Sequence, residues 1–366
     1  MECVKAAQTF FLEDLSRLKL IGFSDEFIEL VGISPRYQQK IPSCRPDFLW
    51  NEKKISLLEL NCDSPAMMTF TDVLEEWQIN RLLPEILPIT QKAEPNRTRF
   101  LYNALLKCFK EAGGENSKPT IAIVDWRGGK TAHELQKTSQ FFEEFGSNSF
   151  VCDPRDLVYK DGKLTFENKV IDVVQRRVLF PDFVSRKDEL KPLLDAYKEG
   201  AVCMVNPLRS YICGNKNFLT FLSAPKNTHV FPEECLKALS RTVIPTKRLE
   251  EAVIADVIKE QNRWVLKASF SYGGQSVHFG RSTSKKDWQA LLTNANPSEW
   301  VLQPILEIPQ IDLPVKIDGK VVNQPFYANW SPWFFGGEYA GSTTRSSAEP
   351  LVSISCRGAL HPTVPI

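Results

Sequence analysis

The chain has 366 residues, of which 43% are hydrophobic and 24% are charged. This length is enough for two or three packed units, and the proportions are those of a globular, water-soluble protein. Because 45 basic residues balance 44 acidic ones and no basic stretch stands out, nucleic acid is disfavoured as the main partner.

The cysteines and the N-terminus both favour a cytoplasmic location. Nine cysteines lie scattered along the chain without a CxxC pair, a usage that indicates reduced thiols. The N-terminal stretch mixes apolar and charged side chains, unlike the apolar centre of a signal peptide. No apolar run reaches the length of about 18 residues that a membrane-spanning helix needs, so we expect no membrane partner.

Residues 1–115 are predicted to be helical around one strand pair. Apolar residues recur at helical spacing near positions 10–18 and 74–82. Between these helices, residues 46–50 and 55–60 have the pattern of two strands joined by a polar turn at 51–54. The stretch 112–118, AGGENSK, is typical of a connector and predicts a domain boundary near residue 115.

From residue 116 to 205 the pattern becomes that of a Rossmann-like α/β unit. An apolar, β-branched run at 120–124 predicts a buried strand, and a helix is predicted over 132–145. Further strands are expected at 149–152 and 169–175, with a hairpin whose tip is the DGK of 161–163. Alternating strands and helices of this kind form an open sheet.

Residues 206–366 alternate predicted strands with helices. A helix is expected over 247–260, and strands are expected at 264–267, 277–279, 300–303 and 323–333. Gly336 and Gly337 mark a hairpin turn after the last of these strands. The chain is therefore predicted to be of the α/β (α+β) class, in three domains over 1–115, 116–205 and 206–366.

Four polar residues stand at matching positions of the first strand pair. Side chains alternate along a strand, so Arg45 and Asp47 point to one face, as do Glu59 and Asn61. If the two strands pair, three oxygen donors and one guanidinium converge, and Mg²⁺ prefers such oxygens together with phosphate and water. The alternative is a solvated face of a surface hairpin. The leucines around Glu59 indicate that this residue is buried. A buried carboxylate requires a partner, which favours the metal site over the solvated face.

The C-terminal region contains weaker candidates for a phosphate site. Lys267 ends a predicted strand and is followed by a loop with Gly273 and Gly274, whose backbone amides could surround phosphates. An ordinary hairpin turn is the alternative. Lys216 is at the start of an apolar helix. If it is buried, its ammonium requires an anionic partner; the alternative is a surface lysine, which requires none. Gln303, before a proline, could offer main-chain groups to an adenine ring or belong to a simple linker.

With these residues in view, the chain resembles the circularly permuted ATP-grasp proteins, which include the synthetase module of glutathionylspermidine synthase. The segment RPDFLWNEKKISLLELNCDSPA is similar to the R-x-D and E-x-N-x-D-x-P elements of the group. IAIVDW, FVCDPRDLVYKDGKL and IDVVQRR resemble its Rossmann-like pre-ATP-grasp domain. NPLRSYICGNK, WVLK, SYGGQSV, VLQPILE and FFGGEYAGSTTR resemble its lysines, glycine loop, adenine hinge and closing strands.

The resemblance implies an ATP-grasp fold in circularly permuted order and an ATP- and Mg²⁺-dependent ligase. It implies Asp47, Glu59 and Asn61 as metal ligands, Arg45 and Arg345 as catalytic arginines, and a set of nucleotide-binding residues: Lys216, Lys267, Gly273, Gly274 and Gln303. The expected reaction joins a small-molecule acid, such as an amino acid or short peptide, to an amine through an acyl phosphate. Two alternatives remain: a catalytically silent nucleotide-binding protein and an ATP-dependent small-molecule kinase.

Overall fold

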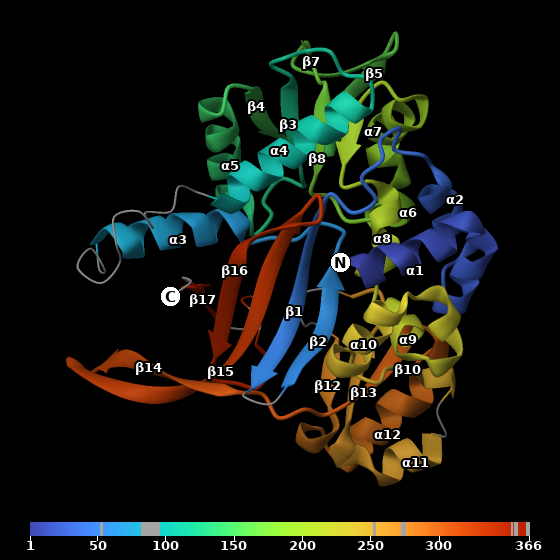
Figure 1. The fold of residues 1–366 in the computed structure, drawn as a ribbon, viewed down its shortest axis with the longest axis vertical. Helices are drawn as coiled ribbons and strands as arrows, with labels where there is room; N and C mark the ends of the chain where they lie inside the picture. The colour runs from blue at the N-terminus through green and yellow to red at the C-terminus, as the bar shows by residue number, and fades with distance from the viewer. Residues whose placement is uncertain are drawn as a thin grey trace.

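The computed structural model describes residues 1–51, 54–81, 96–251, 254–271, 276–352, 354 and 358–363. Over these ranges the chain forms a mixed α/β structure with one large sheet and three smaller ones (Figure 1). The predicted fold class is therefore confirmed. In the same ranges, none of the helices has both the length and the apolar character needed to cross a membrane.

The large sheet is antiparallel and joins strands from both ends of the chain. Its order is β17-β16-β15-β1-β2, and β14 pairs with β15 off this path. The strands are β1 (Ser43–Asn51), β2 (Lys54–Asn61), β14 (Gln310–Ile317), β15 (Lys320–Phe335), β16 (Glu338–Ser347) and β17 (Ala359–Thr363). The predicted hairpin at 46–60 is confirmed as β1 and β2, although residues 52 and 53 of its turn lie outside the described residues. The turn predicted at Gly336 and Gly337 joins β15 to β16.

A parallel sheet lies beside it, in the order β4-β3-β8-β9. It consists of β3 (Thr120–Val124), β4 (Asn148–Cys152), β8 (Val173–Arg176) and β9 (Cys203–Val205). Helices cover both faces, because Ile121 packs in a core with α4 (Asn96–Glu111) and α5 (Ala132–Glu144), whereas Ala122 packs in a core with α7 (Lys187–Glu199). Burial on both faces explains the continuous apolar run of β3.

The strand predicted over 169–175 is wrong in extent. Its first part, β7 (Lys169–Val170), pairs with β6 (Lys163–Phe166) in a small sheet with β5 (Val158–Lys160), and its second part is β8 of the parallel sheet. The break falls at Ile171 and Asp172, where backbone hydrogen bonds to Leu164 and Thr120 pull the chain from one sheet to the other. A period-2 apolar pattern does not show which sheet each residue joins.

The third sheet is antiparallel, in the order β10-β13-β11-β12. Its strands are β10 (Lys247–Arg248), β11 (Trp264–Ala268), β12 (Val277–Phe279) and β13 (Trp300–Pro304). α11 (Ile254–Lys259) and α12 (Lys285–Asn294) pack on it around a separate core that contains Trp288. The helix predicted over 247–260 is thus wrong at its start, because Lys247 and Arg248 pair with β13 instead.

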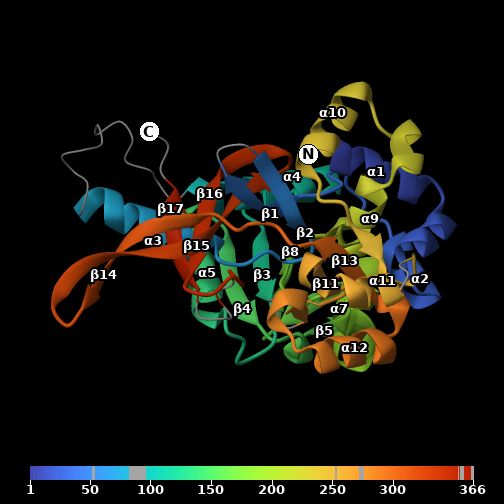
Figure 2. The ribbon, with the colours of Figure 1, turned by 90° about the horizontal axis from the view of Figure 1, so that it is seen from below.

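Helices from the N-terminus and from the middle of the chain pack together. They are α1 (Glu2–Glu13), α2 (Asp25–Gly32), α6 (Asp182–Ser185), α8 (Tyr211–Gly214), α9 (Asn217–Ser223) and α10 (Glu233–Thr242), while α3 (Met68–Arg81) lies beside α4. Phe11 of α1 and Phe221 of α9 are in contact, with ring centroids 4.6 Å apart. Figure 2 shows α1, α9 and α10 grouped on one side, and β14 projecting on the other.

Candidate active site

The polar residues of the β1–β2 hairpin lie on one face, as their spacing predicts. Arg45 is directly opposite Asn61, and Asp47 is directly opposite Glu59. A bulge follows, because Phe48 pairs with Leu57 and leaves Leu58 as the extra residue of β2. The bulge places Leu58 beside Glu59 on the wall of the same pocket.

Asp47 is the most tightly held carboxylate of the pocket. Its oxygens accept from Arg45 Nε at 3.1 Å and from Asn61 Nδ2 at 3.1 Å, and Arg345 Nη2 lies 2.6 Å away. Burial alone would raise the pKa of Asp47, but the charges of Arg345 and Arg45 outweigh burial and hold this pKa well below its usual range. Asp47 is therefore ionised at any pH at which the protein works.

The donor set of the hairpin suits a hard divalent cation. The amide nitrogen of Asn61 donates to Asp47 and to the Arg45 carbonyl, which leaves the amide oxygen for a ligand. Glu59 is 35% exposed into the pocket, and the ammonium of Lys216 is 3.8 Å from it. Two carboxylates and one amide oxygen with room for phosphate and water are the ligands that Mg²⁺ prefers, so these residues fit that ion.

Two lysines face the hairpin from other parts of the chain. Lys216 is the N-cap residue of α9, and its ammonium donates to the Ser271 carbonyl at 2.6 Å. Lys267 projects from β11 into the same pocket. Burial lowers the pKa of Lys267 to about 8; the charge of Lys216 adds to this effect, and Glu59 opposes it. An anion beside a buried lysine of lowered pKa favours the charged form of the ammonium, so Lys267 is suited to bind an anionic ligand.

The pocket between the large sheet and the β10–β13 sheet brings these residues together. Four cations (Arg45, Arg345, Lys216 and Lys267) and two carboxylates (Asp47 and Glu59) line it, so its charged lining is net positive. The space, including the part open to solvent, is about 1080 Å³. Its polar end adjoins an apolar end formed by Ile244, Val265, Val277, Phe279, Leu306 and Ile308.

Gln303 lines the apolar end, but its side chain is already engaged. Its amide Nε2 donates to Thr246 Oγ1 at 3.0 Å, and the residue is buried. The predicted contact of Gln303 with an adenine ring stays a prediction. Gly273 and Gly274 lie outside the described residues, and nothing in the structure tests their predicted role.

Sequence reasoning missed the residues that orient Arg345. Asn329 is opposite Arg345 in the β15–β16 pairing, and its Oδ1 accepts from Arg345 Nε at 3.2 Å. Ser331 accepts from the same guanidinium at 3.3 Å. The alternation of Asn329 and Ser331 in an otherwise aromatic strand is a signal that could have identified them.

The family of the chain follows from comparison with known proteins. The family model described as glutathionylspermidine synthase preATP-grasp matches residues 1–361, and the chain belongs to this family. Comparison with curated protein sequences gives no match.

Solved structures agree on the fold. A glutathione synthetase-like effector from Globodera pallida has a TM-score of 0.66 at 12% identity, over 100% of this chain and 85% of that one. A putative gamma-glutamylcysteine synthetase from Methylobacillus flagellatus KT has a TM-score of 0.51 at 11% identity, over 99% of this chain and 86% of that one. The chain has the mixed α/β fold of ATP-grasp-type ligases.

Proposed function

We propose that this chain is an ATP- and Mg²⁺-dependent carboxylate–amine ligase whose metal ligands precede its lysines because the ATP-grasp order is circularly permuted. The observation that carries the proposal is the single pocket lined by Asp47, Glu59, Asn61, Lys216, Lys267 and Arg345. These residues come from four segments, each more than 50 residues from the next along the chain, and a surface hairpin would not need them together.

Each end of the pocket has its own task. The apolar end, between β11, β12 and the segment after β13, accommodates the adenine ring. Lys216 and Lys267 pair with the α- and β-phosphates. Asp47, Glu59 and Asn61 would hold Mg²⁺, which offsets the charge of the β- and γ-phosphates when bound. The glycines at 273 and 274 belong to the proposed loop over the phosphates.

The two arginines act on the transferred group. In the proposed reaction, a substrate carboxylate attacks the γ-phosphorus of ATP, ADP leaves, and the acid becomes an acyl phosphate. An amine then attacks the acyl carbon, phosphate leaves, and an amide forms. Arg345 and Arg45 stabilise the charge on the transferred phosphoryl group, and their ion pairs with Asp47 keep both guanidinium groups oriented.

The first test is calorimetry of ATP binding with and without Mg²⁺. The wild type is expected to bind Mg²⁺–ATP, and the double variant Glu59→Ala/Asn61→Ala is expected to lose the Mg²⁺-dependent part. Glu338→Ala changes an exposed carboxylate at the far end of β16 and serves as the control. Absence of binding in the wild type would overturn the nucleotide site.

Turnover distinguishes the ligase from its alternatives. Acid and amine pairs are screened for phosphate release, and hydroxylamine is added to trap the acyl phosphate. We expect Glu59→Ala to lower turnover more than about a hundredfold, since a metal-ligand carboxylate contributes several kcal/mol. A stable phosphorylated product without trapping would show a kinase. ATP binding without turnover in the screen would instead favour a silent nucleotide-binding protein.

A further inference from the structure

The segment between β2 and α3 joins the large sheet to the parallel sheet beside the pocket. This bridging segment, residues 62–67, begins directly after the proposed metal ligand Asn61 and ends where α3 begins. Arg45 contacts it from the large sheet, and Arg177 contacts it from the end of the parallel sheet. The bridging segment therefore connects a proposed catalytic arginine with a part of the chain that does not line the pocket.

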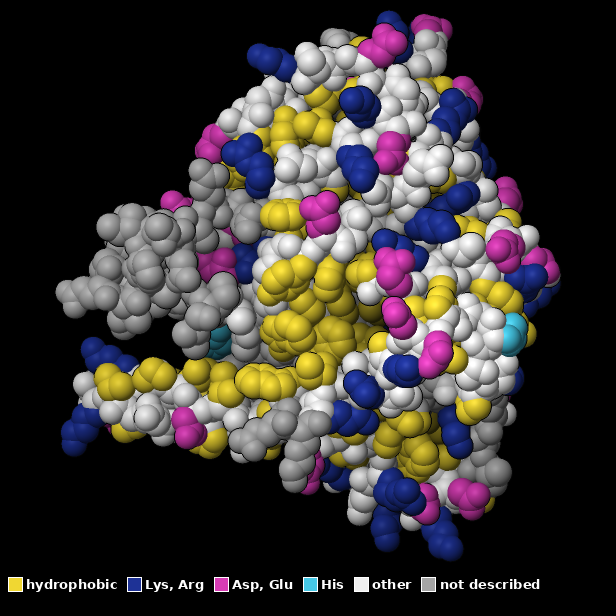
Figure 3. Space-filling model, viewed as in Figure 1, with side chains coloured by type: hydrophobic (Ala, Val, Ile, Leu, Met, Phe, Trp, Pro, Cys, Tyr) yellow, Lys and Arg dark blue, Asp and Glu magenta, His cyan; other side chains and the backbone are white. Residues whose placement is uncertain are grey.

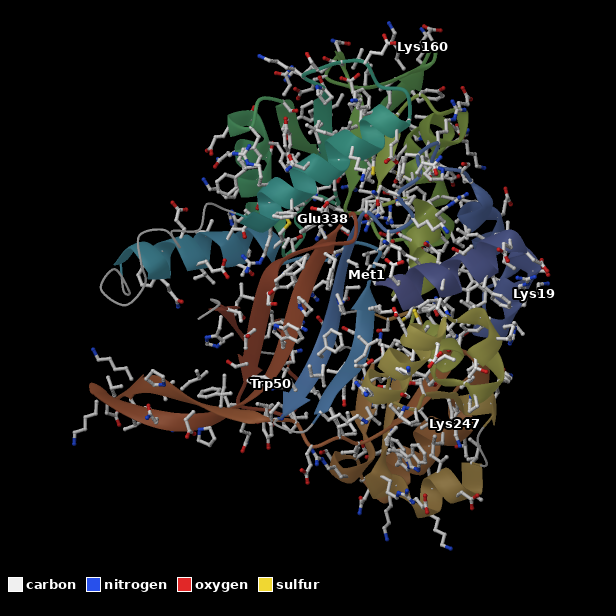
Figure 4. All side chains as sticks on the ribbon, viewed as in Figure 1. Met1, Lys19, Trp50, Lys160, Lys247 and Glu338 are labelled. Carbon is white, nitrogen blue, oxygen red and sulfur yellow. The ribbon has the colours of Figure 1, made fainter. Side chains whose placement is uncertain are left out.

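Arg45 lies near the end of the large sheet that faces the parallel sheet. Ser43, two residues earlier, is opposite Phe335, which is itself opposite Glu338. Figure 4 shows Glu338 at the end of the large sheet that adjoins α4, and Trp50 at the opposite end. Contacts across this junction can therefore reach Arg45 directly.

Two acceptors orient the guanidinium of Arg45. Its Nε donates to Asp47 at 3.1 Å, and its Nη1 donates to the Ala66 carbonyl of the bridging segment at 2.6 Å. Asp47 is also a proposed metal ligand, so a bound cation would share its oxygens with Arg45. The Ala66 carbonyl is then the partner on which the direction of the guanidinium most depends.

Two charged side chains hold the bridging segment on either side of that carbonyl. Arg177, which directly follows β8, donates from Nη1 to the Pro65 carbonyl at 2.6 Å. Glu134, in the first turn of α5, accepts from the backbone N–H of Met67 at 2.9 Å and from that of Thr69 at 3.2 Å. The residue between Pro65 and Met67 is thus fixed from both neighbours.

The burial of Glu134 and Arg177 is unusual for charged residues. Figure 3 shows Lys, Arg, Asp and Glu side chains spread over the surface in view, as is normal for a water-exposed face. Glu134 is only 3% exposed and Arg177 only 9%. Burial raises the pKa of Glu134, and the charge of Arg177 opposes this effect. The two side chains therefore compensate each other's charge beside the bridging segment.

Stability alone does not account for this arrangement. The φ angle of Met67 is +76°, a left-handed conformation that is costly for a residue other than glycine. The Nε of Arg177 is buried, and it has no hydrogen-bond partner among the residues that the structure describes. Costs of this kind persist where the surrounding structure fixes the geometry of a functional site.

We propose that Glu134 and Arg177 are positioning residues for Arg45, acting through the carbonyl of Ala66. This inference rests on the proposed function, in which Arg45 stabilises the transferred phosphoryl group. A shift of Ala66 would move the guanidinium away from that group and leave the lysines of the pocket in place. The parallel sheet thus contributes to phosphoryl transfer, although neither Glu134 nor Arg177 lines the pocket.

The test is the affinity for Mg²⁺–ADP, measured by calorimetry with and without aluminium fluoride, which takes the place of the transferred phosphoryl group. In the wild type, aluminium fluoride should tighten ADP binding about a hundredfold or more, as expected of a transition-state analogue. Glu134→Gln keeps the size of the side chain but has one acceptor oxygen for two N–H groups. It should lower the gain from aluminium fluoride about tenfold and change the affinity for Mg²⁺–ADP alone less than about twofold.

Arg177→Lys is the second variant, because it keeps the charge and loses the fixed geometry of the guanidinium. It should lower the gain in the same selective way. Asp153→Asn is the matched control. Asp153 is also buried and also accepts from two backbone N–H groups, those of Arg127 and Arg155, which belong to the loops after β3 and β4. Its variant should keep the full gain, and the affinity for Mg²⁺–ADP shows in each case that the pocket is folded.

A double-mutant cycle tests the route through Arg45. Arg45→Gln should itself reduce the gain, and adding Glu134→Gln should reduce it no further. Additive losses would show that Glu134 acts independently of Arg45 and would overturn the proposal. It would also be ruled out by an unchanged gain in Glu134→Gln and Arg177→Lys, by an equal loss in Asp153→Asn, or by a parallel loss of Mg²⁺–ADP affinity in both variants.

The wild type separates this inference from the proposed function. Binding of Mg²⁺–ADP without any gain from aluminium fluoride would contradict the role of Arg45, and the inference with it, and would leave the nucleotide site standing. Absence of Mg²⁺–ADP binding would overturn the nucleotide site itself.

Discussion

Lys267 makes nucleotide binding dependent on pH. Burial lowers its pKa to about 8, so its ammonium is protonated at pH 7 and largely neutral at pH 9. A bound phosphate favours the charged form and raises this pKa. Affinity for Mg²⁺–ATP should therefore be flat below pH 8 and fall by up to about tenfold for each pH unit above it. Calorimetry in buffers of different ionisation enthalpy should detect proton uptake on binding near pH 9.

Lys267→Arg is the matched variant for this prediction. A guanidinium stays charged throughout this pH range, so the variant should bind without proton uptake and without the decline above pH 8. If Lys267→Arg and the wild type showed the same pH dependence, a group other than Lys267 would be responsible.

Arg345 stabilises the fold through Asp47. Because the folded-state pKa of Asp47 lies below its unfolded value, its ionised form contributes stability that is present above about pH 4 and is lost as the pH falls through the folded pKa. Arg345→Gln leaves the buried carboxylate with Arg45 as its one remaining arginine, beside the hydrogen bond from Asn61. We expect a loss of about 1–3 kcal/mol in the free energy of unfolding at pH 7, measured by urea denaturation.

The same variant should also unfold at a higher pH on acidification, since the pKa of Asp47 rises when one arginine is removed. Arg263→Gln is the control, because its ion pair with Glu260 is exposed and surface pairs contribute little. Equal stability of Arg345→Gln and the wild type at pH 7 would contradict the assigned role.

At the scale of elements, Gly280 holds the end of β12 against the turn before β11. A Cβ atom at this position would overlap the backbone carbonyl of Gln261, which a side-chain rotation cannot relieve. Gly280→Ala should therefore push β12 away, cost about 1–3 kcal/mol of stability and weaken nucleotide binding, because Val277 and Phe279 of β12 line the pocket. Thermal denaturation and calorimetry measure the two effects.

Gly32→Ala is the matched control for the glycine argument. Its added Cβ would meet only the end of the flexible Leu15 side chain, at 3.2 Å. The variant should keep both the stability and the nucleotide affinity of the wild type. Loss of affinity in Gly32→Ala equal to that in Gly280→Ala would show that the effect is not local to β12.

Local pattern predicted the elements whose burial is regular. The β1–β2 hairpin and α5 were predictable because their side chains alternate or repeat with a fixed period, and β3 because it is a continuous apolar, β-branched run. The bulge at Leu58 was not, since it depends on pairing with β1. The split of β7 from β8, and the strand β10 at a predicted helix start, were missed for the same reason: hydrogen bonds to distant strands override local preference.

The candidate site shows the same division. Asp47, Glu59 and Asn61 could be grouped from their spacing, because a hairpin brings near neighbours in the sequence together. The alternation of Asn329 and Ser331 in an aromatic strand marks them as candidates, but their contact with Arg345 follows only from the register of β15 on β16. The hydrogen bond from Gln303 to Thr246 likewise follows only from the tertiary structure. Contacts between residues far apart in the sequence produce no local sequence pattern from which they could be predicted.

At the scale of the whole molecule, the buried cores divide the chain unequally. One core extends from α1 through the β1–β2 hairpin to the parallel sheet, so N-terminal residues such as Phe11 share it with Val174. The β10–β13 sheet has a separate and smaller core around Trp288 and Leu266. Polar contacts join the two parts near the pocket, among them Ser269 with Asn217 and Lys216 with the Ser271 carbonyl.

This division predicts where the free protein opens first. The amides of β11 and β13 should exchange hydrogen faster than those of β3 and β8, because a small core supports less stability against local unfolding.

Mg²⁺–ATP contacts both sides of the pocket, so at about 100 times its dissociation constant it should add about 2.7 kcal/mol against any opening that breaks the pocket. Exchange of β11, β13 and the β1–β2 hairpin should slow, whereas that of β3 and β8 should change little. In Glu59→Ala/Asn61→Ala the Mg²⁺-dependent slowing should disappear. Uniform slowing across the parallel sheet as well would mean that the pocket and the parallel sheet open as one unit.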